Sequence, residues 1–389
     1  MAHEDTISVP RTARRRRVWS ETLPYDALAS KEVGDLLLRY DLEVLVAVTP
    51  SLRAEAPRVL RALADRGARA AVWPMIDDAE GRWASAPTLT KYVAFVDALT
   101  ADLARAHVAV TEVAIDLEPP FSVAKAASHG TWLDPIRGAL AGREDFWSAA
   151  TNLRSYVDRL GKGTRVTCAA VPLVLLDEPN FSGAHGDGHR DSSPAGPTGL
   201  AHPPNPARPG RPGNSGSLGS ATRPGSPGNR EPSAAAERPF FQALLGTPVD
   251  AVPFGSVSIM AYTSILEGWS RGLLDRRASL GVLGECARLS VARYAARASL
   301  SIGTVGVGAF TDEPIYRGPS ELAEDVAVAR AFGVDDLSLF DLGGIVRRGP
   351  PEAWLEAFVN DTERPHDLPR RVRIGSACLR ALARFGGAP

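Results

Sequence analysis

The stretch of sequence that decides the fold is Val113-Ala114-Ile115-Asp116-Leu117-Glu118-Pro119-Pro120. An apolar run leads into it and the two prolines end it, so we predict a strand over Val110–Leu117. Side chains two residues apart on a strand point to the same side, which gives Asp116 and Glu118 a common face. A strand that is apolar along its length and acidic at its end predicts a buried sheet with a polar site at the strand's C-terminal end.

Short apolar runs of this kind recur along the whole chain, and longer amphipathic stretches separate them. The predicted strands are Val18–Leu23, Val44–Thr49, Ala70–Ile76, Val110–Leu117, Arg165–Leu173, Ser256–Tyr262, Leu300–Val307 and Leu337–Leu342. Several are apolar at nearly every position, which is typical of parallel strands buried on both faces. The helical patterns between them include Ala54–Arg66, Lys91–His107, Phe146–Leu160, Cys286–Ala298 and Ser320–Phe332. Eight strand-then-helix repeats predict an α/β protein with a single (β/α)8 TIM barrel.

Two segments fall outside this rhythm. Residues 179–238 consist largely of Gly, Pro, Ser, Arg and Asn, and such a composition cannot bury enough apolar surface to offset its ordering entropy. We therefore predict a disordered insertion after the fifth strand. Residues 1–17, which end in four consecutive arginines, are predicted to form a flexible basic arm. The barrel would then occupy residues 18–389 on either side of the insertion.

The bulk composition is that of an ordinary globular protein. The chain has 389 residues, 44% hydrophobic and 23% charged, and its net charge of −1 predicts neither a nucleic-acid nor a membrane partner. We predict no metal or other cofactor, because no histidine falls at a predicted strand end and the three cysteines are far apart. No apolar stretch has the length of a signal peptide, which predicts a cytoplasmic protein, or a secreted or periplasmic one if the true start lies upstream. The scarcity of lysine beside arginine indicates a GC-rich bacterial genome, and the oligomeric state is left open.

Polar residues that follow the predicted strands are the candidate site residues, because a barrel of this kind carries its active site at the C-terminal ends of its strands. Two neighbouring carboxylates repel one another, so one of Asp116 and Glu118 would have a raised pKa and could act as a general acid. A structural carboxylate pair bonded to backbone or arginine is the alternative. Further candidates are Asp77 after the third strand, Tyr262 at the end of the sixth and Asp341 at the end of the eighth.

Aromatic side chains in the predicted loops are candidates for contact with a sugar, whose apolar ring face packs against aromatic rings. Trp83 and Trp132 fall in the loops after the third and fourth strands, and Phe310 follows the seventh. Trp73 lies within a strand and is predicted to belong to the core. An acid pair beside a tyrosine at a barrel mouth suggests glycoside chemistry, with a carbohydrate as the partner.

The sequence resembles glycoside hydrolase family 18, the chitinase-like barrels, in two motifs. That family carries D-x-x-D-x-D-x-E at the end of strand four, and Asp116-Leu117-Glu118 matches its final D-x-E. It also carries M-x-Y on strand six, which Met260-Ala261-Tyr262 matches, with Thr263 where an aspartate often follows. The order and spacing of the two motifs agree with the family, so the resemblance extends over much of the chain.

The chain departs from the family at three positions. The two earlier acids of the strand-four motif fall on Thr111 and Ala114, and the family's tryptophan on strand eight is replaced by Phe340 or Leu342. These departures indicate a divergent relative. They keep open a catalytically inactive barrel that binds a sugar or a protein, whereas a metal-dependent phosphodiesterase or isomerase would need histidines at the strand ends.

The resemblance implies substrate-assisted hydrolysis of an N-acetylated glycan. Glu118 would protonate the glycosidic oxygen, and the acetamide of the substrate would attack the anomeric carbon. Asp116 would orient that amide, and Tyr262 would hydrogen-bond its oxygen. The residues expected to contact the substrate are Trp83, Trp132, Asp77, Met260, Phe310 and Asp341.

Overall fold

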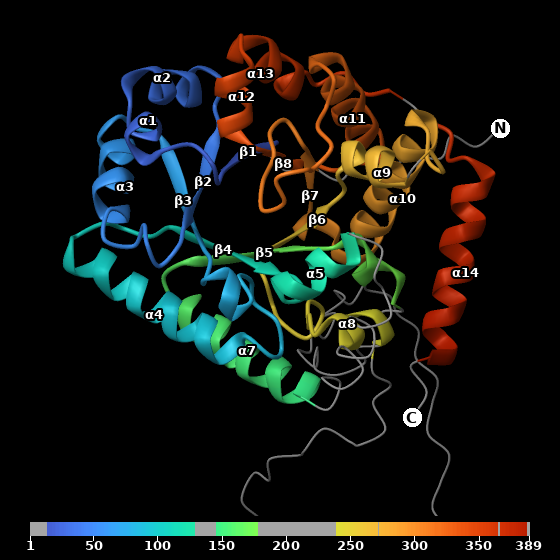
Figure 1. Ribbon diagram of the computed structural model, residues 1–389, viewed down its shortest axis with the longest axis horizontal. Helices are drawn as coiled ribbons and strands as arrows, with labels where there is room; N and C mark the ends of the chain where they lie inside the picture. The colour runs from blue at the N-terminus through green and yellow to red at the C-terminus, as the bar shows by residue number, and fades with distance from the viewer. Residues whose placement is uncertain (1–13, 129–144, 178–238, 271, 365, 387–389) are drawn as a thin grey trace, which may run out of the picture. The chain divides into compact units, whose positions relative to one another are not determined.

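The computed structural model describes residues 14–128, 145–177, 239–270, 272–364 and 366–386. Its eight strands are parallel and close into a barrel in chain order, with β1 paired to both β2 and β8 (Figure 1). The strands are β1 (Arg15–Ser20), β2 (Glu43–Val48), β3 (Arg69–Pro74), β4 (Glu112–Leu117), β5 (Arg165–Ala170), β6 (Ser256–Met260), β7 (Ala298–Gly303) and β8 (Asp336–Phe340). The predicted (β/α)8 barrel is confirmed.

Helices surround the barrel (Figure 1). They are α1 (Tyr25–Leu28), α2 (Lys31–Arg39), α3 (Ala56–Asp65), α4 (Leu89–Arg105), α5 (Phe121–Ser128), α7 (Phe146–Leu160), α8 (Phe240–Leu245), α9 (Thr263–Trp269), α10 (Arg276–Tyr294), α11 (Pro319–Ala331), α12 (Leu342–Arg348), α13 (Pro351–Val359) and α14 (Arg370–Gly386). Ser30 and Asp275 cap the starts of α2 and α10 by accepting hydrogen bonds from backbone N–H groups. Gly67 and Gly333, with φ angles of +81° and +84°, follow α3 and α11 in the left-handed conformation that glycine tolerates.

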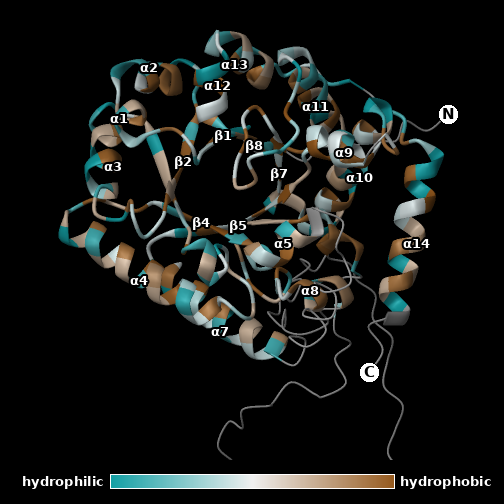
Figure 2. Ribbon diagram, in the orientation of Figure 1, coloured by the Kyte–Doolittle hydropathy of each residue, from teal (hydrophilic) through white to brown (hydrophobic). Residues whose placement is uncertain are grey.

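The alternation of side chains along each strand gives the barrel two cores. The outward-pointing Val113 and Ile115 of β4 belong to the large core between the strands and the helices. The inward-pointing Ala114 packs inside the barrel with Trp19 and Trp73. Figure 2 shows the apolar residues that run along β4 and β5. This alternation turns the acidic end of β4 toward the barrel axis, as the sequence predicts.

The first strand begins at Arg15, so the prediction of a flexible arm over residues 1–17 is wrong at its end. Arg17 is 1% exposed, and its guanidinium donates hydrogen bonds to Asp336 at 3.0 Å and to Glu112 at 3.3 Å. The inside of the barrel can bury this arginine because two carboxylates compensate its charge. The basic run therefore belongs to the barrel wall and not to a solvated arm.

The acids that compensate these arginines each begin a strand. Glu43 begins β2, Glu112 begins β4 and Asp336 begins β8, and Arg15 pairs with the first two of them. Parallel strands start at the same end of a barrel, so the opposite charges meet there. An acid at the start of three strands was the sequence signal for this network.

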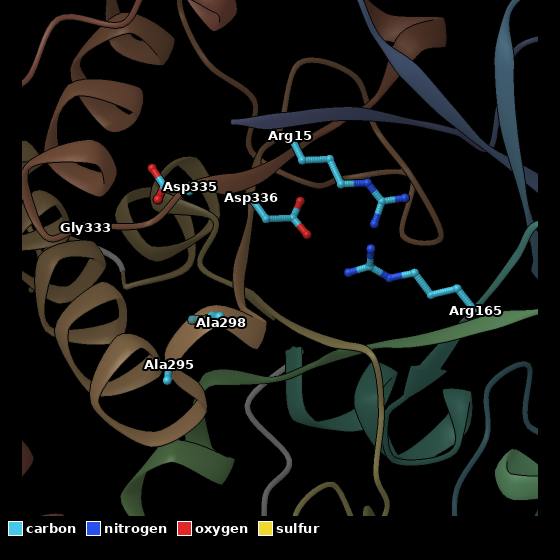
Figure 3. A pocket seen from close by; sticks show the side chains of 8 residues that line it. Arg15, Arg165, Ala295, Ala298, Gly333, Asp335 and Asp336 are labelled. Atoms are coloured by element: carbon cyan, nitrogen blue, oxygen red, sulfur yellow. The ribbon is translucent and has the colours of Figure 1, made fainter. Parts of the chain in front are cut away.

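A pocket with a cavity volume of about 200 Å³ opens at this N-terminal end of the strands (Figure 3). The guanidinium groups of Arg15 and Arg165 point toward each other across it, and Asp336 lies beside them. All three side chains already take part in ion pairs. The N-terminal face of such barrels serves stability rather than catalysis, so we assign this pocket to the fold.

The segment 179–238, predicted as a disordered insertion, lies entirely outside the described residues. In the part of the chain that the structure describes, no helix combines the length and apolarity needed to cross a membrane.

Candidate active site

A cleft with a cavity volume of about 70 Å³ opens at the C-terminal end of the barrel. Its lining comes from β1, β3, β4, β6 and β8 and from the loops that follow β1, β3, β4, β6 and β7. The lining residues are Trp19, Glu21, Trp73, Arg82, Trp83, Asp116, Glu118, Met260, Tyr262, Ala309, Phe310, Glu313 and Phe340. The cleft thus combines carboxylates, aromatic rings and one cation.

The backbone around the two acids of β4 is held from both sides. Ala84, in the loop after β3, donates its N–H to the carbonyl of Asp116 at 3.0 Å. The carbonyl of Ala84 accepts the N–H of Glu118 at 3.2 Å. On the other side, β5 pairs with β4 in a register that matches Asp116 with Ala169. These contacts fix the direction in which both carboxylates leave the strand.

Asp116 is buried, and its two carboxylate oxygens differ. Oδ2 accepts a hydrogen bond from the indole Nε1 of Trp73 at 2.8 Å. Oδ1 is buried and has no hydrogen-bond partner among the described residues. Burial raises the pKa of Asp116 to about 7, although the bond from Trp73 opposes the shift. A buried acceptor without a partner is uncommon in proteins and marks a place where a ligand or water would bind.

Glu118 lies one residue beyond the end of β4 and lines the same cleft. No hydrogen bond to its side chain is found in the described ranges. Burial, and after it the charge of Asp116, raises the pKa of Glu118 well above its usual value. This shift favours the protonated form of Glu118, which is the form that a general acid needs.

The cleft holds more acids than cations. Glu21 and Glu313 also line it, and among the lining residues only Arg82 is a cation. Arg82 forms ion pairs with Glu21 and with Asp78, the second at 2.6 Å. Burial raises the pKa of Glu21 to about 7, although Arg82 opposes the shift. Because Arg82 is the one cation beside four carboxylates, their mutual repulsion adds to burial, and the pKa of each of the four is raised.

The floor of the cleft is aromatic. Trp73 packs edge-on against Trp19, with ring centroids 4.7 Å apart, and against Phe340 at 6.5 Å. Tyr262 lies 5.9 Å from Phe340, and its hydroxyl is 3.1 Å from the hydroxyl of Ser301. Trp73, predicted as core, is buried and also serves the site through its bond to the acid of β4.

A second aromatic group closes the cleft from the loop side. Phe310 stacks on Phe121 of α5, with ring centroids 5.3 Å apart and an interplanar angle of 8°. Trp83 contacts Phe121 at 5.7 Å, and Trp269 contacts Phe310 at 5.9 Å. Of the predicted sugar-contacting residues, the cleft thus contains Trp83, Phe310 and Met260.

The other predicted contact residues do not line the cleft. Asp77 is exposed to solvent, where it precedes a short turn of helix. Asp341 is buried as the cap of α12, and its oxygens accept hydrogen bonds from the N–H of Gly344 at 2.8 Å and from Thr22 at 2.9 Å. Both of its oxygens are engaged in holding the fold, and its role as a substrate contact stays a prediction. Trp132 lies outside the described residues.

Sequence reasoning missed two charged residues of the cleft. Arg82 directly precedes Trp83, and its pairing with Glu21 of the first loop could not be inferred from spacing. Glu313 comes ten residues after the end of β7 in a long loop without periodicity. It accepts hydrogen bonds from the backbone N–H groups of Gly308 and Phe310, the second at 3.3 Å, and so shapes that loop.

Because the cleft contains four carboxylates, we asked whether they could bind a metal ion. Among the described residues, no three His, Cys, Asp or Glu side chains are grouped so that they could hold a metal ion. The acids of the cleft are instead dispersed over β1, β4 and the loop after β7, and one of them is already paired with Arg82.

No protein-family model and no curated protein matches this chain. Among solved structures, the PgaB (BpsB) glycoside hydrolase domain from Bordetella bronchiseptica is similar, with 12% sequence identity and a TM-score of 0.45. The alignment covers 91% of this chain and 100% of that one. So low a score carries no argument about function, and the function has to be derived from the residues of the cleft.

Proposed function

We propose that this protein is a glycoside hydrolase that cleaves an N-acetylated glycan by substrate-assisted acid catalysis. The observation that carries the proposal is the state of Asp116. Trp73 anchors one oxygen of its carboxylate, and the other oxygen is buried without a partner beside Glu118. The N–H of a substrate acetamide would satisfy that oxygen.

In the first step, Glu118 donates its proton to the glycosidic oxygen while the bond from that oxygen to the anomeric carbon breaks. The acetamide carbonyl oxygen of the substrate attacks the anomeric carbon and forms a cyclic oxazolinium ion. Asp116 accepts the amide N–H and stabilises the positive charge that develops on the ring. Tyr262 donates its hydroxyl to the acetamide oxygen and positions it for attack.

In the second step, water attacks the anomeric carbon and the bond to the acetamide oxygen breaks. The Glu118 carboxylate accepts the proton of that water, which returns the acid to its starting state. Two displacements at one carbon leave its configuration retained. The raised pKa of Glu118 supports this role, because the group must be protonated before the first step and accept a proton in the second.

Substrate contacts are assigned to the aromatic and apolar side chains of the cleft. Trp83 and Phe310 offer ring faces for a sugar, and Met260 supplies an adaptable apolar surface. Arg82 is held by two acids and has no obvious task in bond cleavage. We assign it to balancing charge in the cleft.

A second candidate function is that of an inactive sugar- or protein-binding barrel. The replacement of two family acids by Thr111 and Ala114 favours it. Both functions use the same cleft, and turnover separates them.

The test is a pair of matched fluorogenic disaccharides, one built from N-acetylglucosamine and one from glucose. We expect release of the fluorophore from the acetamido substrate alone, because only that substrate carries the internal nucleophile. Equal rates on both substrates would overturn the substrate-assisted mechanism. Binding of the acetamido sugar without release would favour the inactive barrel.

A further inference from the structure

The helix α14 combines exposed apolar side chains with a strong positive charge. Seven large hydrophobic side chains are exposed in the described part of the chain, and α14 carries three of them. These are Ile374 at 52% exposure, Leu379 at 40% and Leu382 at 54%. So many on one helix of 17 residues make a surface feature rather than scattered exposure.

The opposite face of α14 is already used by the fold. The helix lies against α10 and α8 (Figure 1). Ser376 is buried and donates its hydroxyl to Glu285 at 2.8 Å, and Ala383 packs with Leu176 and Phe241. The exposed side of α14 that carries Ile374 and Leu382, called the apolar stripe below, is therefore turned away from the barrel.

The stripe follows the helical repeat. Ile374, Cys378 and Leu382 are four residues apart, so they lie along one side of the helix. Cys378 is exposed as well. Figure 2 shows apolar and polar residues on the same helix. Ile374 and Leu382 thus share one line with Cys378, whereas Leu379 lies nearer the side of buried Ser376 and Ala383.

All the charge on α14 is positive. The helix contains five arginines and no acidic residue, the arginines being Arg370, Arg371, Arg373, Arg380 and Arg384. Arg371 forms an ion pair with Asp275 at 2.9 Å, next to the start of α10. The net charge of −1 for the whole chain conceals this local excess. The composition-based prediction of no membrane partner rested on that net charge.

We propose that the outer face of α14 binds the surface of an anionic lipid bilayer, with its apolar stripe at the boundary of headgroups and acyl chains. Arginines beside an apolar line on one helix match that boundary, since the guanidinium groups reach the phosphates while the aliphatic side chains enter the lipid. The helix lies in the plane of the surface and does not cross the bilayer.

A second copy of the chain fits this face less well. In a symmetric dimer the same patch meets itself, which would set five arginines against five arginines. A nucleic acid would pair with the arginines but leave the apolar stripe without a partner. The arginines of α14 require an anionic partner, and the apolar stripe requires an apolar layer below the anionic groups. An anionic lipid bilayer offers both.

The test is flotation of the full chain with vesicles of phosphatidylcholine, either alone or mixed with anionic phosphatidylglycerol. We expect binding to the anionic vesicles only, and loss of that binding in high salt. The double variant Arg370→Gln/Arg373→Gln should weaken partitioning by roughly 30-fold, about fivefold for each arginine. Leu382→Asp should weaken it at least as much.

Matched controls lie on exposed residues away from α14. Leu38→Asp on α2 changes an equally exposed leucine, and Arg39→Gln/Arg69→Gln removes two exposed arginines, so neither should alter partitioning. Melting temperatures of all variants would verify that they fold. Equal binding to neutral and anionic vesicles, no binding to either, or an unchanged affinity in the α14 variants would overturn the proposal. A change of oligomeric state in those variants without a lipid effect would assign the face to self-association instead.

Discussion

Asp116 and Glu118 leave one strand two residues apart and meet different environments. The carboxylate of Asp116 accepts a hydrogen bond from Trp73, while no hydrogen bond to the side chain of Glu118 is found among the described residues and its pKa is raised by the charge of Asp116. The common face of the two acids could be predicted from the sequence, because it depends only on the two-residue period of a strand. The bond from Trp73 could not, because it depends on how two neighbouring strands align.

The electrostatic coupling of the pair leads to a prediction for pH dependence. The charge of Asp116 raises the pKa of Glu118, so its removal in Asp116→Asn lowers that pKa. Glu118 then loses its catalytic proton at a lower pH, and the basic limb of the kcat/KM profile should move toward acid. Kinetics over a pH range on the acetamido substrate would measure the shift.

Glu313→Gln is the matched control for this shift. Glu313 lines the same cleft and raises the pKa of Glu118 more weakly than Asp116 does. Its variant should therefore move the basic limb in the same direction by a smaller amount. A basic limb that stays in place in Asp116→Asn would mean that another group supplies the proton.

The loop between β7 and α11 governs access to the cleft. Phe310 of this loop stacks on Phe121 and contacts Trp269, and the cavity left beneath is smaller than a typical ligand site. We therefore expect a sugar to enter when these aromatic contacts separate. Each such pair is worth about 0.5–1.5 kcal/mol, so the loop can open at modest cost.

Phe310→Ala should accordingly speed the entry of the substrate. Loss of two aromatic contacts should raise the association rate constant by about tenfold, and should raise the dissociation rate because the ring no longer covers the sugar. Stopped-flow fluorescence with the acetamido disaccharide would measure both. Val307→Ala, an exposed position of the same loop, should leave both rates unchanged. An unaltered association rate in Phe310→Ala would show that the loop does not limit entry.

The elements themselves could largely be predicted from the sequence, and the exceptions have physical reasons. Phe146–Leu160 matches α7 at both ends because one face of this helix is apolar and the other polar. The helix predicted from Cys286 begins instead at Arg276. Small buried residues such as Ala278 and Gly281 line the first part of α10, which packs against α9, α11 and α14. A helix that is contacted on several sides has no single apolar stripe to detect.

At the scale of the whole molecule, buried ion pairs fill the barrel at the N-terminal ends of the strands, and the candidate active site lies at their C-terminal ends. The ion network of Arg17, Glu112 and Asp336 joins β1, β4 and β8. Sequence reasoning placed the arginines outside the barrel because a basic run near a terminus is usually solvated. Their burial depends on acids that lie about 100 and 300 residues away, which no local pattern reports.

This network predicts a large loss of stability in Glu112→Gln. The variant leaves buried Arg17 and partly buried Arg15 with less compensation, which should lower the free energy of unfolding by about 3–5 kcal/mol. Burial opposes the ionisation of Glu112, but the charges of Arg17 and Arg15 outweigh it and lower its pKa. A lowered pKa stabilises the fold above the usual pKa of glutamate, and this contribution is lost as the pH falls through the lowered value.

Chemical denaturation at neutral and at acid pH would check both parts. The difference between Glu112→Gln and the wild type should be large at neutral pH and should shrink in acid. Glu55→Gln, which alters an exposed ion pair with Arg58, should leave the free energy of unfolding nearly unchanged. Equal stability of wild type and Glu112→Gln at neutral pH would rule out a structural role for the network.

The central claim is that Glu118 is the proton donor of a glycoside hydrolase, and the turnover of Glu118→Gln tests it most directly. General acid catalysis contributes about 10²–10⁴-fold, so the variant should lose that factor in kcat on the acetamido disaccharide while its binding of the sugar stays close to wild type. Glu80→Gln, at an exposed acid after β3, should keep full turnover. A Glu118→Gln enzyme that turns over its substrate at the wild-type rate would contradict the account.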